Sequence, residues 1–138
     1  HKRGNPQTMQ SLTDYDDVVG DITAYFEEFA RRAAENGVSR WILDPGFGFA
    51  KTVEQNYRLM AGLDALKRSY GGSVPRILVG VSRKSMIYKT LGISPDDALP
   101  ATQALHMAAL MAGADILRGH DVKEAVQAAS VYKMLAFM

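Results

Sequence analysis

Three groups of polar or charged residues follow short apolar runs in this sequence. They begin at Asp44, Ser82 and Arg118, at similar intervals along the chain, and a stretch with helical periodicity follows each of them. Strands that alternate with helices are typical of βα units, in which the carboxyl ends of parallel strands lie at one edge of the sheet. The sequence therefore predicts an α/β fold with three parallel strands and flanking helices, and with reactive side chains at one edge.

The first group is the glycine-rich segment 44–49, with the sequence DPGFGF. The Asp44 carboxylate could accept paired hydrogen bonds from adjacent N–H groups of a nitrogen heterocycle, and Phe47 and Phe49 offer a stacking surface. The alternative is that Asp44 caps a turn while the phenylalanines pack beneath a loop, and the residue pattern alone favours neither. The spacing of the glycines fits neither the P-loop nor the dinucleotide-binding fingerprint.

The second group, Ser82 to Ser85, follows an apolar run at residues 76–81. Hydroxyl groups, the cations Arg83 and Lys84, and backbone N–H groups at a helix start favour a carboxylate or phosphate site. Two adjacent cations also repel each other unless an anion or a carboxylate compensates them. The alternative is that both cations are solvated loop charges and that Ser85 is only a helix cap.

The third group places Arg118 and His120 at alternate positions of an extended segment, so that both side chains are expected to project to the same side. Arginine suits bidentate phosphate binding, and imidazole can donate a hydrogen bond or a proton. The alternative is a salt bridge from Arg118 to Asp115 or Asp121. His106 lies in a very apolar, buried-looking helical stretch and is predicted to be an interior or interface residue with its hydrogen bonds satisfied, rather than a ligand.

Helices are expected over 14–36, 52–68, 85–91, 94–112 and 122–138, and strands over 39–43, 76–81 and 115–117. Thr52, Ser85 and Ser94 are the predicted N-caps, and loops are expected over 1–13 and 69–75. Three strands cannot close a barrel of eight. The sheet is therefore either a small open α/β sheet or the last portion of a barrel. One edge of it would be bare and apolar, which favours a fragment or a self-associating chain.

The composition excludes several classes of protein. The chain has 138 residues, of which 47% are hydrophobic and 22% charged, which excludes intrinsic disorder. A net charge of +1 and the lack of any long apolar stretch predict no nucleic-acid partner and no membrane partner. The chain has no cysteine, which fits a reducing cytoplasm, and no spacing typical of metal ligands. It begins at His1, without a signal-peptide pattern or an initiator methionine, and so we expect a fragment.

Read together, these residues resemble dihydropteroate synthase of the folate pathway. Segments 1–9, 44–49, 55–56, 79–85 and 118–122 carry the resemblance in this order. It implies that residues 1–138 are a single fragment of a pterin-binding (β/α)8, or TIM, barrel. The fragment would be the C-terminal part, from the loop after strand five through helix eight. Two mild departures are Ala50, where the family often has glycine, and Gly119, where a β-branched residue is common.

The resemblance implies a transferase that condenses 6-hydroxymethyl-7,8-dihydropterin pyrophosphate with p-aminobenzoate, giving 7,8-dihydropteroate and pyrophosphate, and that is a sulfonamide target. It implies that Asp44 and Lys84 are the catalytic residues and hydrogen-bond the pterin. Ser85 would hold the p-aminobenzoate carboxylate, and Arg118 and His120 would bind the departing pyrophosphate. The full set of implied substrate-binding residues is Asp44, Gly48, Phe49, Gly80, Ser82, Lys84, Ser85, Arg118 and His120.

The resemblance also implies that Mg²⁺ assists the departure of pyrophosphate, with its ligand in the N-terminal part that is absent from this sequence. We expect the fragment alone to be inactive and to form a homodimer, through its C-terminal helices, or a swapped oligomer. Two alternatives are a pterin-binding domain of a corrinoid methyltransferase, against which the run 82–85 argues, and a non-catalytic fragment that binds only an anion.

Overall fold

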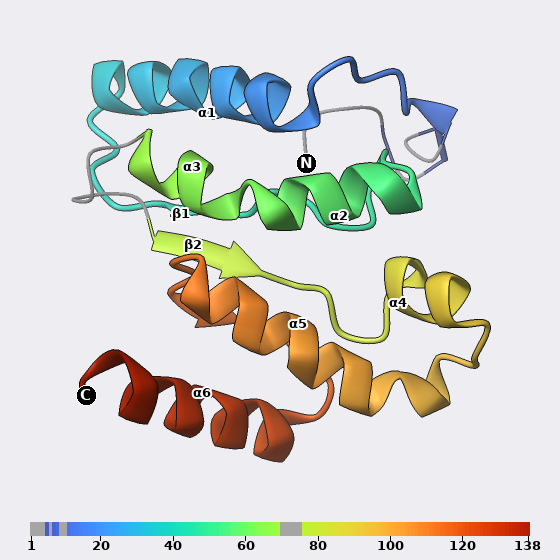
Figure 1. The fold of residues 1–138 in the computed structure, drawn as a ribbon. Helices are drawn as coiled ribbons and strands as arrows, with labels where there is room; N and C mark the ends of the chain where they lie inside the picture. The colour runs from blue at the N-terminus through green and yellow to red at the C-terminus, as the bar shows by residue number, and fades with distance from the viewer. Residues whose placement is uncertain (1–4, 6, 9–10, 70–75) are drawn as a thin grey trace.

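A computed structural model describes residues 5, 7–8, 11–69 and 76–138. Most of the predicted linker over 69–75 and part of the predicted loop over 1–13 lie outside these residues. In chain order the elements are α1 (Val18–Glu35), β1 (Ile42–Leu43), α2 (Val53–Ala61), α3 (Leu63–Arg68), β2 (Arg76–Val79), α4 (Ser85–Leu91), the 3₁₀ helix η2 (Asp96–Ala98), α5 (Leu99–Met111), β3 (Ile116–Leu117) and α6 (Val122–Ala136). Figure 1 shows α1 lying over α2 and α3, and β2 lying between these helices and α5.

The described strands form one parallel sheet in the order β1-β2-β3. Leu43 is in register with Ile77, and Val79 is in register with Leu117. The α/β prediction with three parallel strands is therefore confirmed. β1 and β3 each contain 2 residues, fewer than predicted.

Asp115, predicted as the first residue of the third strand, instead lies just before it and uses its side chain to join the strands. Its carboxylate accepts a hydrogen bond from the Ile77 N–H at 2.8 Å and forms an ion pair with Lys67. The backbone N–H of Asp115 donates to the Ile77 carbonyl at 2.9 Å. These contacts close the amino end of the β2–β3 pair.

The helix ends follow capping chemistry more closely than apolar periodicity. α1 starts later than predicted because the Asp17 side chain accepts a hydrogen bond from the Val19 N–H at 3.1 Å. Thr52 caps α2 as predicted, in a capping box with Gln55. The single helix predicted over 52–68 is wrong, because the chain breaks at Gly62 into α2 and α3.

Two predicted N-caps differ from the structure. Ser85 is the first residue of α4, and Lys84 occupies the cap position without a side-chain capping hydrogen bond. Ser94 accepts a hydrogen bond from the Asp97 N–H at 3.3 Å, but it precedes η2, and α5 begins only at Leu99. The predicted helix over 94–112 is thus a short 3₁₀ turn followed by an α-helix.

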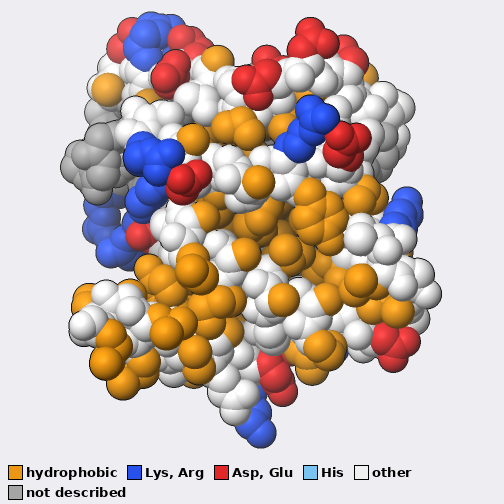
Figure 2. All heavy atoms as spheres, in the orientation of Figure 1, with side chains coloured by type: hydrophobic (Ala, Val, Ile, Leu, Met, Phe, Trp, Pro, Cys, Tyr) orange, Lys and Arg blue, Asp and Glu red, His pale blue; other side chains and the backbone are white. Residues whose placement is uncertain are grey.

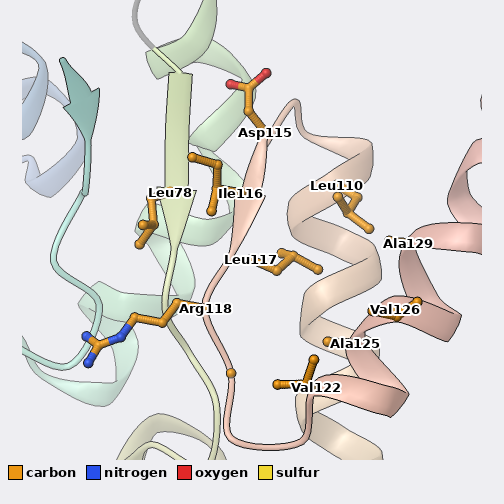
Figure 3. Close-up of a pocket in the computed structure, with 11 residues that line it drawn as sticks. Leu78, Leu110, Asp115, Ile116, Leu117, Arg118, Val122, Ala125, Val126 and Ala129 are labelled. Atoms are coloured by element: carbon orange, nitrogen blue, oxygen red, sulfur yellow. The ribbon is translucent and has the colours of Figure 1, made fainter. Parts of the chain in front are cut away.

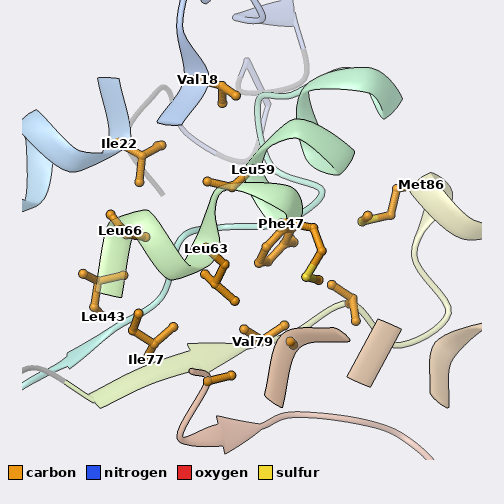
Figure 4. Close-up of a cluster of buried hydrophobic side chains, with 14 of the residues drawn as sticks. Val18, Ile22, Leu43, Phe47, Leu59, Leu63, Leu66, Ile77, Val79 and Met86 are labelled. Carbon is orange, nitrogen blue, oxygen red and sulfur yellow. The ribbon is translucent and has the colours of Figure 1, made fainter. Parts of the chain in front are cut away.

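The hydrophobic core lies between the sheet and the helices that precede β2. Figure 4 shows side chains from α1, from α2 and α3, and from the strands meeting there, with Phe47 of the first loop among them. The largest fully buried hydrophobic side chains are Ile22, Leu43, Phe47, Leu59, Leu63, Leu66, Ile77, Val79, Val81, Met86 and Ile87. Burial of Phe47 fixes the loop that leaves β1, since its ring is anchored in this core.

The helix α6 has no buried residue, although many of its side chains are apolar. Val126, Met134 and Leu135 are 58%, 68% and 63% exposed. Figure 2 shows hydrophobic side chains gathered over the part of the molecule where α6 ends. No helix in the described part of the chain is both long and apolar enough to span a bilayer.

Candidate functional site

The three predicted groups lie at the carboxyl ends of the three described strands. Asp44 follows β1, Gly80 follows β2, and Arg118 follows β3. Because the strands are parallel, all three groups start at the same edge of the sheet. Figure 3 shows the Arg118 side chain at this edge, extending across the end of β2, while Asp115 lies at the opposite end of β3.

The first loop, residues 44–50, is held by side chains on its inner side. Asp44 Oδ1 accepts a hydrogen bond from the Gly46 N–H at 2.9 Å, so that the predicted turn cap is present. The Gly48 N–H donates to Asn56 Oδ1 at 2.7 Å. The ammonium group of Lys51 donates to the carbonyls of Gly46 at 2.9 Å and Phe49 at 3.0 Å. These hydrogen bonds fix the conformation of the loop within the protein itself.

Lys84 crosses the outer side of the same loop. Its Nζ donates to the Phe47 carbonyl and lies 4.5 Å from the centroid of the Phe49 ring. Gly48 has φ +82°, and a Cβ there would lie 2.9 Å from Lys84 Cδ. Glycine suits this position, because L side chains rarely adopt this backbone conformation and a Cβ would require the lysine side chain to shift. Three predicted substrate-binding residues, Gly48, Phe49 and Lys84, are thus in one place.

Positive charge is in excess around Lys84 at this edge of the sheet. Burial lowers the pKa of Lys84, the Asp44 carboxylate opposes this shift, and the Arg118 guanidinium adds to it. Burial also lowers the pKa of Lys51 to about 8, an effect that Asp44 opposes and the charge of Lys84 reinforces. The Asp44 carboxylate therefore acts on two lysines, and Arg118 adds a further positive charge, an arrangement that favours an anionic ligand.

Arg83 does not contribute to this excess of positive charge. Its Nε and Nη2 donate to the two carboxylate oxygens of Asp121 at 2.9 and 2.8 Å, and Nη1 donates to the carbonyls of Pro95 and Asp96. Its backbone N–H donates to Thr102. Arg83 has φ +54°, in the left-handed region. The alternative of Arg83 as a solvated loop charge is wrong, because these donors have partners within the protein. Its charge is compensated by the carboxylate of Asp121.

His120 and Arg118 have different surroundings. The Ser82 hydroxyl lies 2.9 Å from His120 Nδ1 and accepts a hydrogen bond from the His120 backbone N–H at 3.2 Å. Ser82 is buried, whereas His120 and Arg118 are exposed. The alternative salt bridge of Arg118 is not formed, because Asp115 pairs with Lys67 and Asp121 pairs with Arg83.

Gly80 and Ser85 frame the second group. Gly80 directly follows β2, and a Cβ there would lie 3.9 Å from Arg118 Cβ, so that the second and third groups are in close proximity. Ser85 is half-buried at the first position of α4. The structure thus places both residues at the predicted edge.

Sequence reasoning gave no role in the first loop to Lys51 or Asn56, which hold it, and it considered Asp121 as a partner of Arg118 rather than of Arg83. Asn56 gave one signal, a polar residue on the buried face of a helix. The contacts of the other two residues depend on loop conformation, which hydrophobic periodicity does not encode. His106 is fully buried, as predicted, and burial lowers its pKa. Its Nδ1 lies 3.1 Å from Gln103 Oε1, but its Nε2 has no hydrogen-bond partner among the described residues, so that the predicted satisfaction is only partial.

A cavity of about 520 Å³ lies next to this edge rather than within it. Its lining residues are Leu78, Leu110, Asp115, Ile116, Leu117, Arg118, Gly119, Val122, Ala125, Val126 and Ala129. Figure 3 shows Leu110, Leu117 and Val126 facing it from α5, β3 and α6, whereas the Arg118 side chain extends away from these helices. The cavity is therefore an apolar space beside the outer strand β3, distinct from the Lys84 region.

Comparison with known proteins places the chain in a family. Residues 1–120 match the family model described as pterin binding enzyme. The chain belongs to this family, and the predicted TIM-barrel class is confirmed by its structural relatives. The dihydropteroate synthase of Escherichia coli K12 is 43% identical over 133 residues, and that of Synechocystis sp. is 46% identical over 134 residues. These alignments cover 95% of this chain but 46% and 45% of the relatives, about half of their length.

Solved structures give the same result. The dihydropteroate synthase of Yersinia pestis in a sulfonamide drug complex superposes with a TM-score of 0.92 at 36% identity, over 100% of this chain and 50% of that one. The Thermus thermophilus synthase in complex with 4-aminobenzoate gives a TM-score of 0.88 at 38% identity, over 98% and 54%. The resemblance to dihydropteroate synthase read from the sequence is confirmed.

Proposed function

We propose that this chain carries part of the substrate site of a dihydropteroate synthase. The parent enzyme would join 6-hydroxymethyl-7,8-dihydropterin pyrophosphate to p-aminobenzoate, giving 7,8-dihydropteroate and pyrophosphate. The observation that carries this proposal is the position of Lys84. Its ammonium group lies over the Phe49 ring, and the charges of Asp44 and Arg118 both act on its pKa. The relatives from Thermus thermophilus solved with 6HMPPP and with 4-aminobenzoate support it.

In this proposal the carboxylate of Asp44 accepts hydrogen bonds from N–H groups of the pterin ring, and Lys84 donates to an acceptor of the same ring. Phe49 and Gly48 border the p-aminobenzoate site, and the Ser85 hydroxyl binds its carboxylate. Gly80 and Ser82 shape the floor between these sites. Each of these roles is carried over from the family resemblance to the matching residue of this chain.

The reaction forms a C–N bond and breaks a C–O bond. The amine nitrogen of p-aminobenzoate attacks the methylene carbon of the pterin, pyrophosphate leaves with the electron pair of the C–O bond, and the amine loses a proton. Arg118 and His120 would donate hydrogen bonds to the departing pyrophosphate, where negative charge accumulates in the transition state.

The family resemblance implies Mg²⁺, and we propose that its ligand lies in the half of the relatives that this chain does not cover. In the described part of the chain no group of three or more histidine, aspartate or glutamate side chains could hold a metal ion. We therefore assign no step of the reaction to a metal held by these residues.

We expect the chain alone to have no synthase activity, because its relatives are about twice as long. We also propose that residues 1–138 correspond to the segment from the loop after strand five through helix eight. Detectable turnover of the pterin pyrophosphate by the purified chain would contradict the expected inactivity.

Calorimetry with separate ligands tests the proposal. Titration with a pterin, a sulfonamide and inorganic pyrophosphate should give heat for each, and Lys84→Met should weaken pterin binding by at least tenfold. Lys89→Met, which changes an exposed lysine of α4, should leave it unchanged. Pyrophosphate binding alone would favour the anion-binding fragment, and pterin binding without sulfonamide binding would favour a corrinoid methyltransferase domain.

A further inference from the structure

The Ser82 hydroxyl contacts His120 at two points. Its Oγ accepts a hydrogen bond from the His120 backbone N–H at 3.2 Å and lies 2.9 Å from the ring nitrogen Nδ1. Ser82 is 6% exposed, whereas His120 lies at the surface. A buried hydroxyl therefore holds the main chain and the ring of one exposed histidine together.

The hydroxyl proton determines which ring nitrogen carries a hydrogen. A serine hydroxyl has one proton to donate and two lone pairs. If the neutral ring were protonated at Nδ1, that N–H would donate to Ser82 Oγ, and the serine proton would need another acceptor. Within the described residues the hydroxyl has no further hydrogen-bond partner. A buried and unpaired O–H is costly, so the arrangement in which Ser82 donates to Nδ1 is favoured.

Neighbouring contacts keep this geometry in place. Asp121, which follows His120, uses both carboxylate oxygens for Arg83, the residue next to Ser82. Asp121 is therefore engaged elsewhere and does not compete for Nδ1. The second and third groups are thus joined by a charged pair beside the serine–histidine contact.

We propose that Ser82 is a positioning residue that fixes the neutral His120 ring in the tautomer protonated at Nε2. The ring then presents an N–H donor to a ligand, whereas the other tautomer would present a lone pair at Nε2. A donor suits a diphosphate anion, because its oxygens only accept hydrogen bonds when fully ionised. The choice of ligand rests on the proposed function, but the tautomer does not.

Nitrogen NMR of the full chain tests the tautomer directly. Long-range ¹H–¹⁵N spectra are recorded in alkaline buffer, where free imidazole is neutral, and His120→Gln identifies the signals among the three histidines. His120 should show an unprotonated Nδ1 and a protonated Nε2. The unchanged chain alone can overturn the proposal. It would do so if its His120 ring were protonated at Nδ1 or were an even mixture of the two tautomers.

Two variants test the role of the serine. Ser82→Ala should give a mixture of tautomers and bind inorganic pyrophosphate about tenfold more weakly, and Ser82→Thr, which keeps the hydroxyl, should restore both. Unchanged amide spectra elsewhere in the chain show that each variant is folded. Equal pyrophosphate affinity of Ser82→Ala and the unchanged chain would overturn the positioning role. Lack of pyrophosphate binding in every form, with the Nε2 tautomer present, would instead count against the proposed function.

Discussion

Lys51 and Lys84 contact the same loop and have different surroundings. Lys51 is 6% exposed, and its ammonium group donates to two loop carbonyls. Lys84 reaches a third carbonyl from the outer side. The buried lysine serves the conformation of the loop, and the half-buried one remains accessible to a ligand.

Stability should rise with pH because of Lys51. Its pKa falls from 10.5 in the unfolded chain to about 8 in the folded one. The unfolded chain therefore binds more protons between these values, and the free energy of unfolding increases across this window by up to about 3 kcal/mol. Urea unfolding at pH 7.5 and pH 10 measures the increase.

Lys51→Met should remove most of this increase, and the smaller part due to Lys84 should remain. Lys89→Met, at an exposed position, is the control and should keep the full increase. Equal pH dependence of the two variants would show that the folded chain binds the Lys51 proton as tightly as the unfolded chain does.

Gly48 and Gly37 form a matched pair for a second prediction. Both have positive φ, +82° and +70°, but an added Cβ would lie 2.9 Å from Lys84 Cδ at Gly48 and would meet nothing within 4 Å at Gly37. Gly37→Ala should cost about 1 kcal/mol of backbone strain, and Gly48→Ala should cost about twice as much. Urea unfolding measures both, and equal losses would mean that Lys84 moves aside freely.

At the scale of elements, the ion pair between Arg83 and Asp121 joins the loop after β2 to the loop after β3. Its side chains are 23% and 19% exposed. Asp121 is held below its ordinary pKa of 3.8 by the hydrogen bonds from Arg83. The stabilisation is therefore present above pH 3.8 and is lost as the pH falls through the lowered value.

A double-mutant cycle should reveal the coupling between these loops. Arg83→Met and Asp121→Asn should each lower the thermal midpoint, and the double variant should lower it by less than the sum of the two. The control cycle uses Arg58 and Glu54, an exposed pair on α2 with side chains 65% and 73% exposed, where near-additive effects are expected. Additive effects at both pairs would contradict a role of Arg83 in holding the loops.

Most elements could be predicted from the sequence, because apolar periodicity and parallel βα alternation report local structure. The starts of α1 and α5 and the break at Gly62 could not, since they depend on capping and on packing. For the site, the alternation of strands and helices was enough to predict that the three groups share one edge of the sheet. The apolar helix around His106 was enough to predict its burial. The partners of Arg83 and of Ser82 lie far along the chain, and no local pattern indicates them.

At the scale of the whole molecule, apolar surface remains at the outer strand β3 and on α6. The cavity beside β3 is lined by Leu117 and Val126, and α6 buries none of its side chains. Such surface favours association. We expect the chain to form a dimer or swapped oligomer at micromolar concentration.

Sedimentation velocity tests this expectation with two variants of the same helix. Val126→Lys should shift the chain toward the monomer, because it places a charge in the apolar cavity. Gln127→Lys adds the same charge at an exposed position and should leave the distribution unchanged. A monomeric unchanged chain would contradict self-association through this surface.

The Asp115 carboxylate ties β2, β3 and Lys67 together at the amino end of the sheet, whereas Arg118 lies at the opposite end of β3 (Figure 3). The contacts that hold these strands together therefore lie at the end of the sheet opposite to the proposed ligand site. Substitutions at the carboxyl end should leave the strand pairing intact, whereas a substitution of Asp115 should weaken it.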